Sequence, residues 1–134
     1  MPGYSGTPLV TKLGIKAGSQ LCVVHAPDGY LKWIEPLPEG VRIAARLSSN
    51  VDLVHIFTSH KKELSDALLS YRSALKPTAV VWVSWPKKSS KVPTDITEDT
   101  VRELALPLGF VDIKVCAVTE VWSGLKLVVR KELR

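Results

Sequence analysis

Eight polar residues follow closely after apolar segments of the sequence and could together bind an anion. They are His25, Asp28, Ser59, His60, Lys87, Lys88, Ser89 and Ser90. Lysine side chains supply positive charge, and serine hydroxyls and histidine ring nitrogens can donate hydrogen bonds to phosphate, sulfate or carboxylate oxygens. A site made of these residues would suit a small anionic ligand.

The most basic segment is SWPKKSSK, residues 84–91, which directly follows the apolar run AVVWVSW at 79–85. No acidic residue occurs between Asp66 and Asp95. Two interpretations stay open for this segment: a solvated loop that maintains solubility, or the rim of an anion site to which Trp85 could add a stacking surface. Because the segment has no glycine, it cannot wrap a phosphate as a P-loop does, and no nucleotide triphosphatase is predicted.

A second local signal lies at the start of the strongest helix pattern. Ser59 is a good N-cap, but His60, Lys61 and Lys62 then place cations in the first turn, where the helix dipole disfavours positive charge. The free N–H groups of a helix N-terminus can bind phosphate. The alternative is that these exposed side chains extend into solvent at little cost.

Few residues of the sequence have the pattern that catalysis or metal binding would require. His25 with Asp28 could form an acid/base pair, but no nucleophile or oxyanion loop accompanies it. His55 is interpreted as a hydrogen-bonded core residue, and Cys22 and Cys116 as buried free thiols without metal-binding spacing. We therefore predict no catalytic residue, no metal and no cofactor.

Composition indicates an ordinary globular protein. The 134 residues, of which 46% are hydrophobic and 23% charged, argue against disorder and fit one domain spanning residues 1–134. No apolar run reaches the ~18 residues of a membrane span, and the first residues contain no signal-peptide core, so we expect a cytoplasmic location. The net charge of +5 permits anionic partners without identifying one.

The elements that must position these residues alternate along the chain. Strands are expected at 21–26, at 41–45, at 51–58 and at 79–85, with helical turns at 8–13 and 28–35. Longer helices are expected between Ser59 and Lys76, and from a cap at Asp95 or Thr97 to Gly109. The segments 111–120 and 124–132 should form an antiparallel hairpin, since their connection is too short for a crossover helix.

This pattern predicts an α/β fold: a three-layer sandwich whose mostly parallel, Rossmann-like sheet ends in an antiparallel hairpin. Ligands of such sheets bind outside the carboxyl ends of the strands. We therefore expect three loops, 25–29, 58–62 and 85–90, to converge at that edge.

From residue 51 onward the chain resembles the C-terminal half of a class I, Rossmann-like S-adenosylmethionine (SAM) dependent methyltransferase. The matching segments are VDLVHIFT, a helix ending in LKP, AVVWVSW, a helix ending in LGF, and the terminal hairpin. The segments GYSGTPL, WPKKSS and LPLGFVD also resemble a family of small uncharacterised bacterial proteins, a similarity that implies no particular activity.

The N-terminal half departs from the methyltransferase pattern. The resemblance implies a glycine-rich turn after the first strand and an acidic residue after the second, whereas this sequence has HAPDG at 25–29 and Arg46. Only RLSSN, residues 46–50, separates the second and third strands, so at least one strand and one helix are missing and the topology is truncated. A reversed edge strand at 41–46 stays open.

The function favoured by these observations is a non-enzymatic binding or regulatory module with an anionic ligand or a protein partner and a lost SAM site. An atypical SAM-dependent methyltransferase is the first alternative. The second alternative is a nucleic-acid-associated protein that uses the basic loop Lys87–Lys91. The sequence does not predict an oligomeric state.

Overall fold

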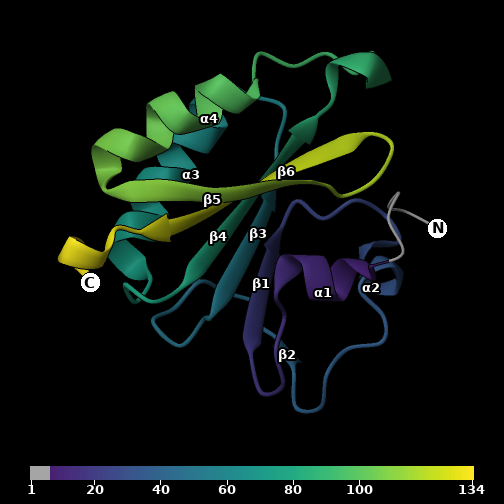
Figure 1. Ribbon diagram of the computed structural model, residues 1–134, viewed down its shortest axis with the longest axis vertical. Coiled ribbons are helices and arrows are strands. Elements are labelled where there is room, and N and C mark those ends of the chain that lie inside the picture. Colours follow the sequence, from purple (N-terminus) through teal and green to yellow (C-terminus); the bar gives the residue numbers. More distant parts are fainter. Residues whose placement is uncertain (1–6) are drawn as a thin grey trace.

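The computed structural model describes residues 7–134 and has a six-stranded sheet with helices on both faces (Figure 1). Its strands are β1 (Gln20–Val24), β2 (Arg42–Ile43), β3 (Leu53–Phe57), β4 (Val80–Pro86), β5 (Phe110–Ala117) and β6 (Trp122–Val129). They lie in the order β2-β1-β3-β4-β6-β5, and β6 runs antiparallel to both of its neighbours. This confirms the predicted, mostly parallel Rossmann-like sheet with a terminal hairpin.

The helices form two layers. They are α1 (Leu9–Leu13), α2 (Tyr30–Trp33), α3 (Lys61–Ala74) and α4 (Glu98–Ala105), with 3-10 turns η1 (Lys88–Ser90), η2 (Leu106–Leu108) and η3 (Lys131–Leu133). In Figure 1, α3 and α4 lie together on one side of the sheet and α1 and α2 on the other. Each layer covers its own hydrophobic core.

Strand β3 explains why two cores form. All five of its residues are buried. Because side chains alternate along a strand, Val54 and Ile56 enter the core under α3 and α4, while Leu53 and Phe57 enter the core under α1 and α2. A continuous apolar run therefore indicated a strand covered on both faces.

The first strand is shorter than the sequence predicts. It was expected to extend to residue 26, but it ends at Val24. The apolar run at 21–26 also indicates a strand buried on both faces, whereas only Leu21 and Cys22 are buried. The chain turns at His25, whose φ of 56° is in the left-handed region and cannot continue a strand. Helix α2 is similarly reduced from the expected range 28–35 to a single turn.

The direction of the second strand is now established. β2 has only two residues and pairs in parallel with the start of β1, as Arg42 with Gln20 and Ile43 with Leu21. The possibility of a reversed edge strand is therefore wrong. A short connection suffices because Ile43 pairs with Leu21, which itself pairs with Leu53 at the start of β3. The chain has little distance to return along the strand direction.

The apolar spacing of α3 is confirmed by the burial of Leu64, Leu68 and Tyr71. Its predicted cap is wrong. The N-cap position is His60 rather than Ser59, and no side chain at that position makes a capping hydrogen bond. The carboxylate of Asp95, from the loop before α4, accepts the backbone N–H of Lys61 at 2.6 Å.

Helix α4 carries the strongest local signal. Of the two predicted caps, Thr97 is the one used: its hydroxyl accepts the N–H of Thr100, whose own hydroxyl accepts the N–H of Thr97. After η2 the chain turns at Gly109 with φ 100°, and a Cβ there would lie 2.7 Å from Leu133. The predicted glycine stop thus has both a conformational and a packing reason.

The remaining predictions concern the N-terminal segment, the two cysteines and the absence of a membrane-spanning segment. The helical turn at 8–13 is confirmed as α1, whereas residues 3–6 of the GYSGTPL segment lie outside the described residues. Cys22 is buried and free, but Cys116, expected to be buried, is only half-buried because it lies on the edge strand β5. Within residues 7–134, no helix has the length and apolarity that crossing a membrane requires.

Candidate functional site

The loops after β1, β3 and β4 leave the same edge of the sheet, because these three strands are parallel. The structure nevertheless distributes the eight candidate residues over four places along that edge. They are the crevice between β1 and β3, a shallow hollow above α2, the start of α3, and a pocket beside β4.

We use the term crevice for the point between β1 and β3 where the strand order reverses, since the chain proceeds from β1 to β2 on one side and to β3 on the other. Doubly wound sheets usually bind ligands at this point. Here the ring of His25, just after β1, pairs with the carboxylate of Glu63 in α3, with Nδ1 and Oε1 3.4 Å apart. Asp28 does not join them and lines the hollow formed by residues 26–32.

Beneath this crevice lies a buried polar network. The ring of His55 in β3 is hydrogen-bonded at Nδ1 to the hydroxyl of Tyr30, at 2.7 Å, and at Nε2 to the hydroxyl of Ser84, at 2.8 Å. Burial lowers the pKa of His55 to about 3, so the ring is neutral, and burial raises the pKa of Tyr30. His55 is therefore the hydrogen-bonded core residue that the sequence indicated.

The start of α3 is tied to the loop that precedes α4. The carbonyl oxygen of Ser59 accepts hydrogen bonds from the Thr94 hydroxyl at 2.8 Å and from the Asp95 N–H at 3.3 Å. Asp95 in turn accepts the N–H of Lys61. A carboxylate of the protein itself thus occupies the position where the N-terminus of α3 would attract an anion.

The pocket beside β4 has a volume of about 570 Å³ and lies between the loop after β4 and the start of α4. Its lining includes Trp85, Lys87, Lys88, Lys91, Ile96 and Ser123. Of the candidates, Lys87 and Lys88 line it, whereas Ser89 and Ser90 are not among its lining residues. The Ser90 hydroxyl donates to the carbonyl of Lys87 at 2.6 Å and accepts the N–H of Val92, so it shapes the turn.

The pocket combines an apolar floor with a basic rim. Trp85 and Ile96 are 5% and 2% exposed. The start of α4 contributes Thr97 and Glu98, and the Glu98 carboxylate is paired with Arg102. Arg102 also bonds Asp112 at 3.0 Å, which lowers the pKa of that carboxyl. Arg102 shares its single positive charge among Glu98, Asp99 and Asp112, so the three lysines at the rim face a carboxylate that is only partly balanced.

Several pocket residues were missed by the sequence reasoning. Val92, Pro93 and Ile96 fold back over Trp85, and Ser123 comes from β6, 38 positions after Trp85. The apolar residues in KVPTDIT, placed between a basic loop and a helix cap, were an available signal. The contribution of Ser123 had none, because it depends on β6 lying next to β4.

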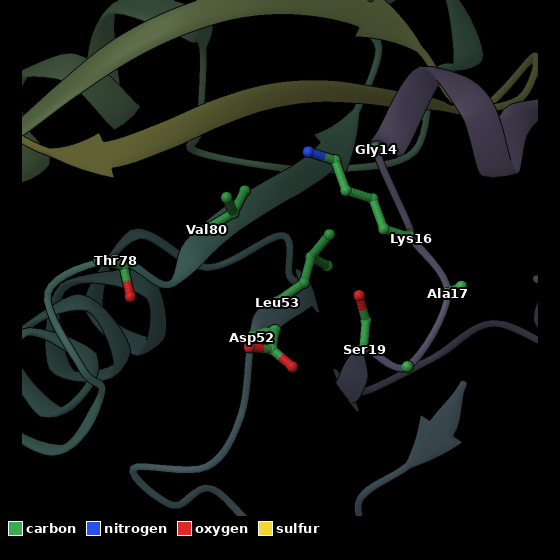
Figure 2. Close-up of a pocket in the computed structure, with 9 residues that line it drawn as sticks. Gly14, Lys16, Ala17, Ser19, Asp52, Leu53, Thr78 and Val80 are labelled. Carbon is green, nitrogen blue, oxygen red and sulfur yellow. The ribbon is translucent and has the colours of Figure 1, made fainter. Parts of the chain in front are cut away.

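A second cleft, of about 450 Å³, opens at the opposite edge of the sheet (Figure 2). It is lined by Lys16, Ser19, Asp52 and Thr78, with Leu53 and Val80 between them. The Asp52 carboxylate accepts the N–H of Gln20 at 2.8 Å and pairs with Lys76 at 2.5 Å, and the Lys76 bond lowers its pKa. This carboxylate therefore has a structural role. Within the described residues, no three His, Cys, Asp or Glu side chains lie together as a metal site would need.

The fold is similar to that of several solved proteins, methyltransferases among them. A SAM dependent methyltransferase from Aquifex aeolicus matches with a TM-score of 0.66 at 17% identity, over 91% of this chain and 88% of its own. Fibrillarin from Aeropyrum pernix, solved with natively bound S-adenosyl-L-methionine, matches at 0.62 and 11%, over 90% and 73%. The M1A22 tRNA methyltransferase TrmK from B. subtilis matches at 0.59 and 10%, over 95% and 67%. At these identities the likeness establishes the fold.

The residues of this chain do not fit SAM in the manner of that fold. The only glycine in the loop after β1, Gly29, begins α2, and a Cβ there would lie 3.3 Å from Trp33 Nε1, so its open side is taken by the protein. Pro27 offers no N–H to a ligand. The position where the resemblance implied a ribose-binding acid holds the cation Arg46, in the loop that follows β2.

Comparison of sequences identifies a family whose description names no activity. No curated protein matches the chain. One family model matches residues 43–131, from β2 to the start of η3, and so includes the pocket beside β4 but not the loop after β1. The chain belongs to this family, described as "Protein of unknown function (DUF3052)".

Proposed function

We propose that this protein is a non-enzymatic binding module whose ligand is a small anion with an apolar portion, held in the pocket between β4 and α4. The observation that carries the proposal is the combination of three lysines at the rim with the buried side chains of Trp85 and Ile96 at the floor. Ligand sites are typically apolar with a few polar groups that fix orientation.

The pocket residues would share the work as follows. Lys87, Lys88 and Lys91 supply positive charge to the anionic group, and the hydroxyls of Thr97 and Ser123 can donate hydrogen bonds to its oxygens. The ring of Trp85 would contact the apolar portion. An aryl or alkyl phosphate or carboxylate has both features, whereas inorganic phosphate has only one.

The side chains around the pocket also support a binding role over catalysis. Its carboxylate, Glu98, is held by Arg102, and no histidine or cysteine is among the lining residues. The histidine network of Tyr30, His55 and Ser84 is fully enclosed, with Tyr30 only 2% exposed. The similarity to methyltransferases supports the fold, while the loop after β1 and Arg46 disfavour the cofactor chemistry of those enzymes.

Thermal unfolding with a panel of ligands tests this proposal. The panel is phenyl phosphate, benzoate, inorganic phosphate, sulfate, SAM and its demethylated product. A ligand at a hundredfold excess over its dissociation constant stabilises the folded state by ~2.7 kcal/mol. We expect phenyl phosphate to raise the melting temperature more than inorganic phosphate does, and SAM to leave it unchanged.

Two double variants with the same change in net charge locate the effect. Lys88→Gln/Lys91→Gln should abolish the phenyl phosphate shift, because both exposed side chains line the pocket. Lys61→Gln/Lys62→Gln, at the start of α3, should retain it. A shift with SAM but with no other ligand, or equal loss in both variants, would contradict the proposed site.

A further inference from the structure

Four lysines from distant parts of the sequence gather on the face of the sheet that bears α1. Lys12 lies in α1, Lys16 in the loop after it, Lys114 in β5 and Lys126 in β6. The charges of Lys16 and Lys114 both act on Lys126, and the charges of Lys12 and Lys114 both act on Cys116. Lys87, which lines the pocket beside β4, also acts on Cys116. We call these four residues the lysine face.

The register of the sheet shows why they share one side. Lys114 pairs with Lys126 across β5 and β6, and Lys126 pairs with Trp82 across β6 and β4. Directly opposite residues project to the same face of a sheet. The indole N–H of Trp82 donates to the carbonyl of Leu13 at the end of α1, 2.9 Å away, and the ammonium of Lys114 lies 5.9 Å from the Trp82 ring.

The lysine face is separate from the pocket beside β4. The neighbours of Lys126 along β6, Leu125 and Leu127, point into the core under α3 and α4. Ser123, two positions before Leu125, lines the pocket beside α4 on that same side. A ligand of the lysine face would therefore contact the opposite side of the sheet.

No carboxylate of the described chain balances these charges. The ion pairs within residues 7–134 involve other cations. Asp52 lines the same cleft as Lys16 but is paired with Lys76, and in Figure 2 the Lys16 side chain extends toward β4, away from Asp52. Burial, followed by the charges of Lys114 and Lys16, lowers the pKa of Lys126. Like charges placed directly opposite on a sheet destabilise it, so this arrangement has a cost that an anion outside the chain would remove.

The arrangement of the charges favours a polyanion with repeating charges. The lysines are spread over a helix, a loop and two strands, and each is a point charge on a flexible stem, which suits phosphates without fixing their geometry. Trp82 is fully buried and offers no surface on which a base could stack. A net charge of +5 with lysines clustered on one face is the electrostatic pattern of nucleic-acid binding.

We infer that the lysine face binds the phosphate backbone of a nucleic acid without reading its base sequence. The site is distinct from the anion pocket beside β4 and does not depend on it. It also differs from the basic loop Lys87–Lys91, through which the sequence alone suggested nucleic-acid association.

Fluorescence anisotropy with the full chain and labelled duplexes of RNA and of DNA tests this inference. The logarithm of the binding constant should fall linearly with the logarithm of salt concentration, by about 0.9 per phosphate contacted. Four contacts predict an affinity loss of about 150-fold between 50 and 200 mM salt. Lys114→Gln/Lys126→Gln should retain two contacts and lose only about 12-fold over the same range, while binding more weakly at 50 mM.

Control variants separate this face from net charge and from the pocket. Lys61→Gln/Lys62→Gln and Lys88→Gln/Lys91→Gln each remove the same charge elsewhere and should keep the native salt dependence. Absence of binding to both duplexes at 50 mM salt, or equal weakening by all three variants, would overturn the inference. Tighter binding of poly-L-glutamate than of either duplex would also overturn it, in favour of an acidic protein partner.

The melting temperature of Lys114→Gln/Lys126→Gln provides a folding check. Removal of two opposed like charges should leave it unchanged or raise it, so weaker binding by a folded variant reports on the contact itself. Binding of RNA alone or of both duplexes supports the inference.

Discussion

The crevice between β1 and β3 and the pocket between β4 and α4 lie at the same edge of one sheet, but only the pocket combines a buried apolar floor with several lysines. In the crevice, His25 pairs with Glu63 above the enclosed network around His55. In the pocket, the loop after β4 turns through η1 and leaves about 570 Å³ beneath three lysines. Strands β1 and β4 run in the same direction in the sheet, so the difference arises in the loops that follow them.

The lengths and residue types of the two loops account for this difference. After β1 only five residues precede α2, and Gly29 is the single glycine among them. Tyr30, at the start of the short α2, reaches down to His55. After β4, the segment 87–97 is longer, and its residues line a pocket together with Trp85 before α4 begins at Glu98. The comparison indicates that the position of a ligand site in this fold depends on the loop sequences more than on the sheet.

The largest expected effect is the loss of stability when His55, at the centre of the buried polar network, is replaced. His55→Ala would remove a fully buried ring stacked on Phe57, with centroids 4.3 Å apart, and leave the hydroxyls of Tyr30 and Ser84 without their partner. Together the cavity and the unsatisfied groups should lower the free energy of unfolding by about 3–5 kcal/mol, measured in urea. Tyr30→Phe, which removes one hydroxyl, should cost only about 1–2 kcal/mol.

The pH dependence of stability provides the control for His55. Its pKa is about 3 in the folded state and near 6.5 when unfolded, so the unfolded state binds an extra proton between these values. The native protein should therefore lose up to about 1.4 kcal/mol of stability per pH unit as the pH falls below 6.5. His55→Ala should lack this component between pH 6.5 and 4.5, above the range in which Asp52 titrates. If the dependence of stability on pH were the same in His55→Ala as in the native protein, His55 would not be held neutral in the folded state.

An intermediate effect is expected where the two regions meet, at Asp95. Asp95→Ala would free the N–H of Lys61 and lower stability by about 1 kcal/mol, the usual value of a helix cap. If Asp95 stands in for an anion, sulfate should stabilise the variant more than it stabilises the native chain at equal ionic strength, measured by thermal unfolding. Asp99→Ala, at the first turn of α4, controls for the general effect of sulfate. If sulfate stabilises the native chain, Asp95→Ala and Asp99→Ala equally, Asp95 acts only as a helix cap and does not occupy an anion site.

The smallest effect is expected at the surface of the crevice. His25→Ala removes a contact between two side chains that are 58% and 42% exposed, so stability should change by less than about 0.5 kcal/mol. Isothermal titration should still detect no SAM binding, because Pro27 and Arg46 remain. Glu63→Gln is the matched variant from the other side of the pair. SAM binding by either variant would mean that the contact between His25 and Glu63 alone closes the crevice.

Much of the fold could be predicted because its signals are local. The spacing of Leu64, Leu68 and Tyr71 indicated α3, and Thr97 indicated the start of α4, since both patterns repeat within one element. The candidate site was less accessible. Lys87 and Lys88 were expected at the carboxyl edge, and the structure puts them beside a pocket, but no local pattern indicated that Ser90 would bond its own turn or that Ser123 would face them.

The sequence by itself determined which segments become strands and helices, because apolar periodicity, caps and turn residues act over a few neighbouring positions. Tertiary structure decided the rest. It brought Asp95 to the N-terminus of α3, 34 positions away, and joined His55 to Ser84, 29 positions away. It also gathered Lys12, Lys16, Lys114 and Lys126 onto one face, through the pairing of β6 between β4 and β5 and the packing of α1 near Trp82. Charge and hydrogen bonding act through space, and the distances that control them exist only after the chain has folded.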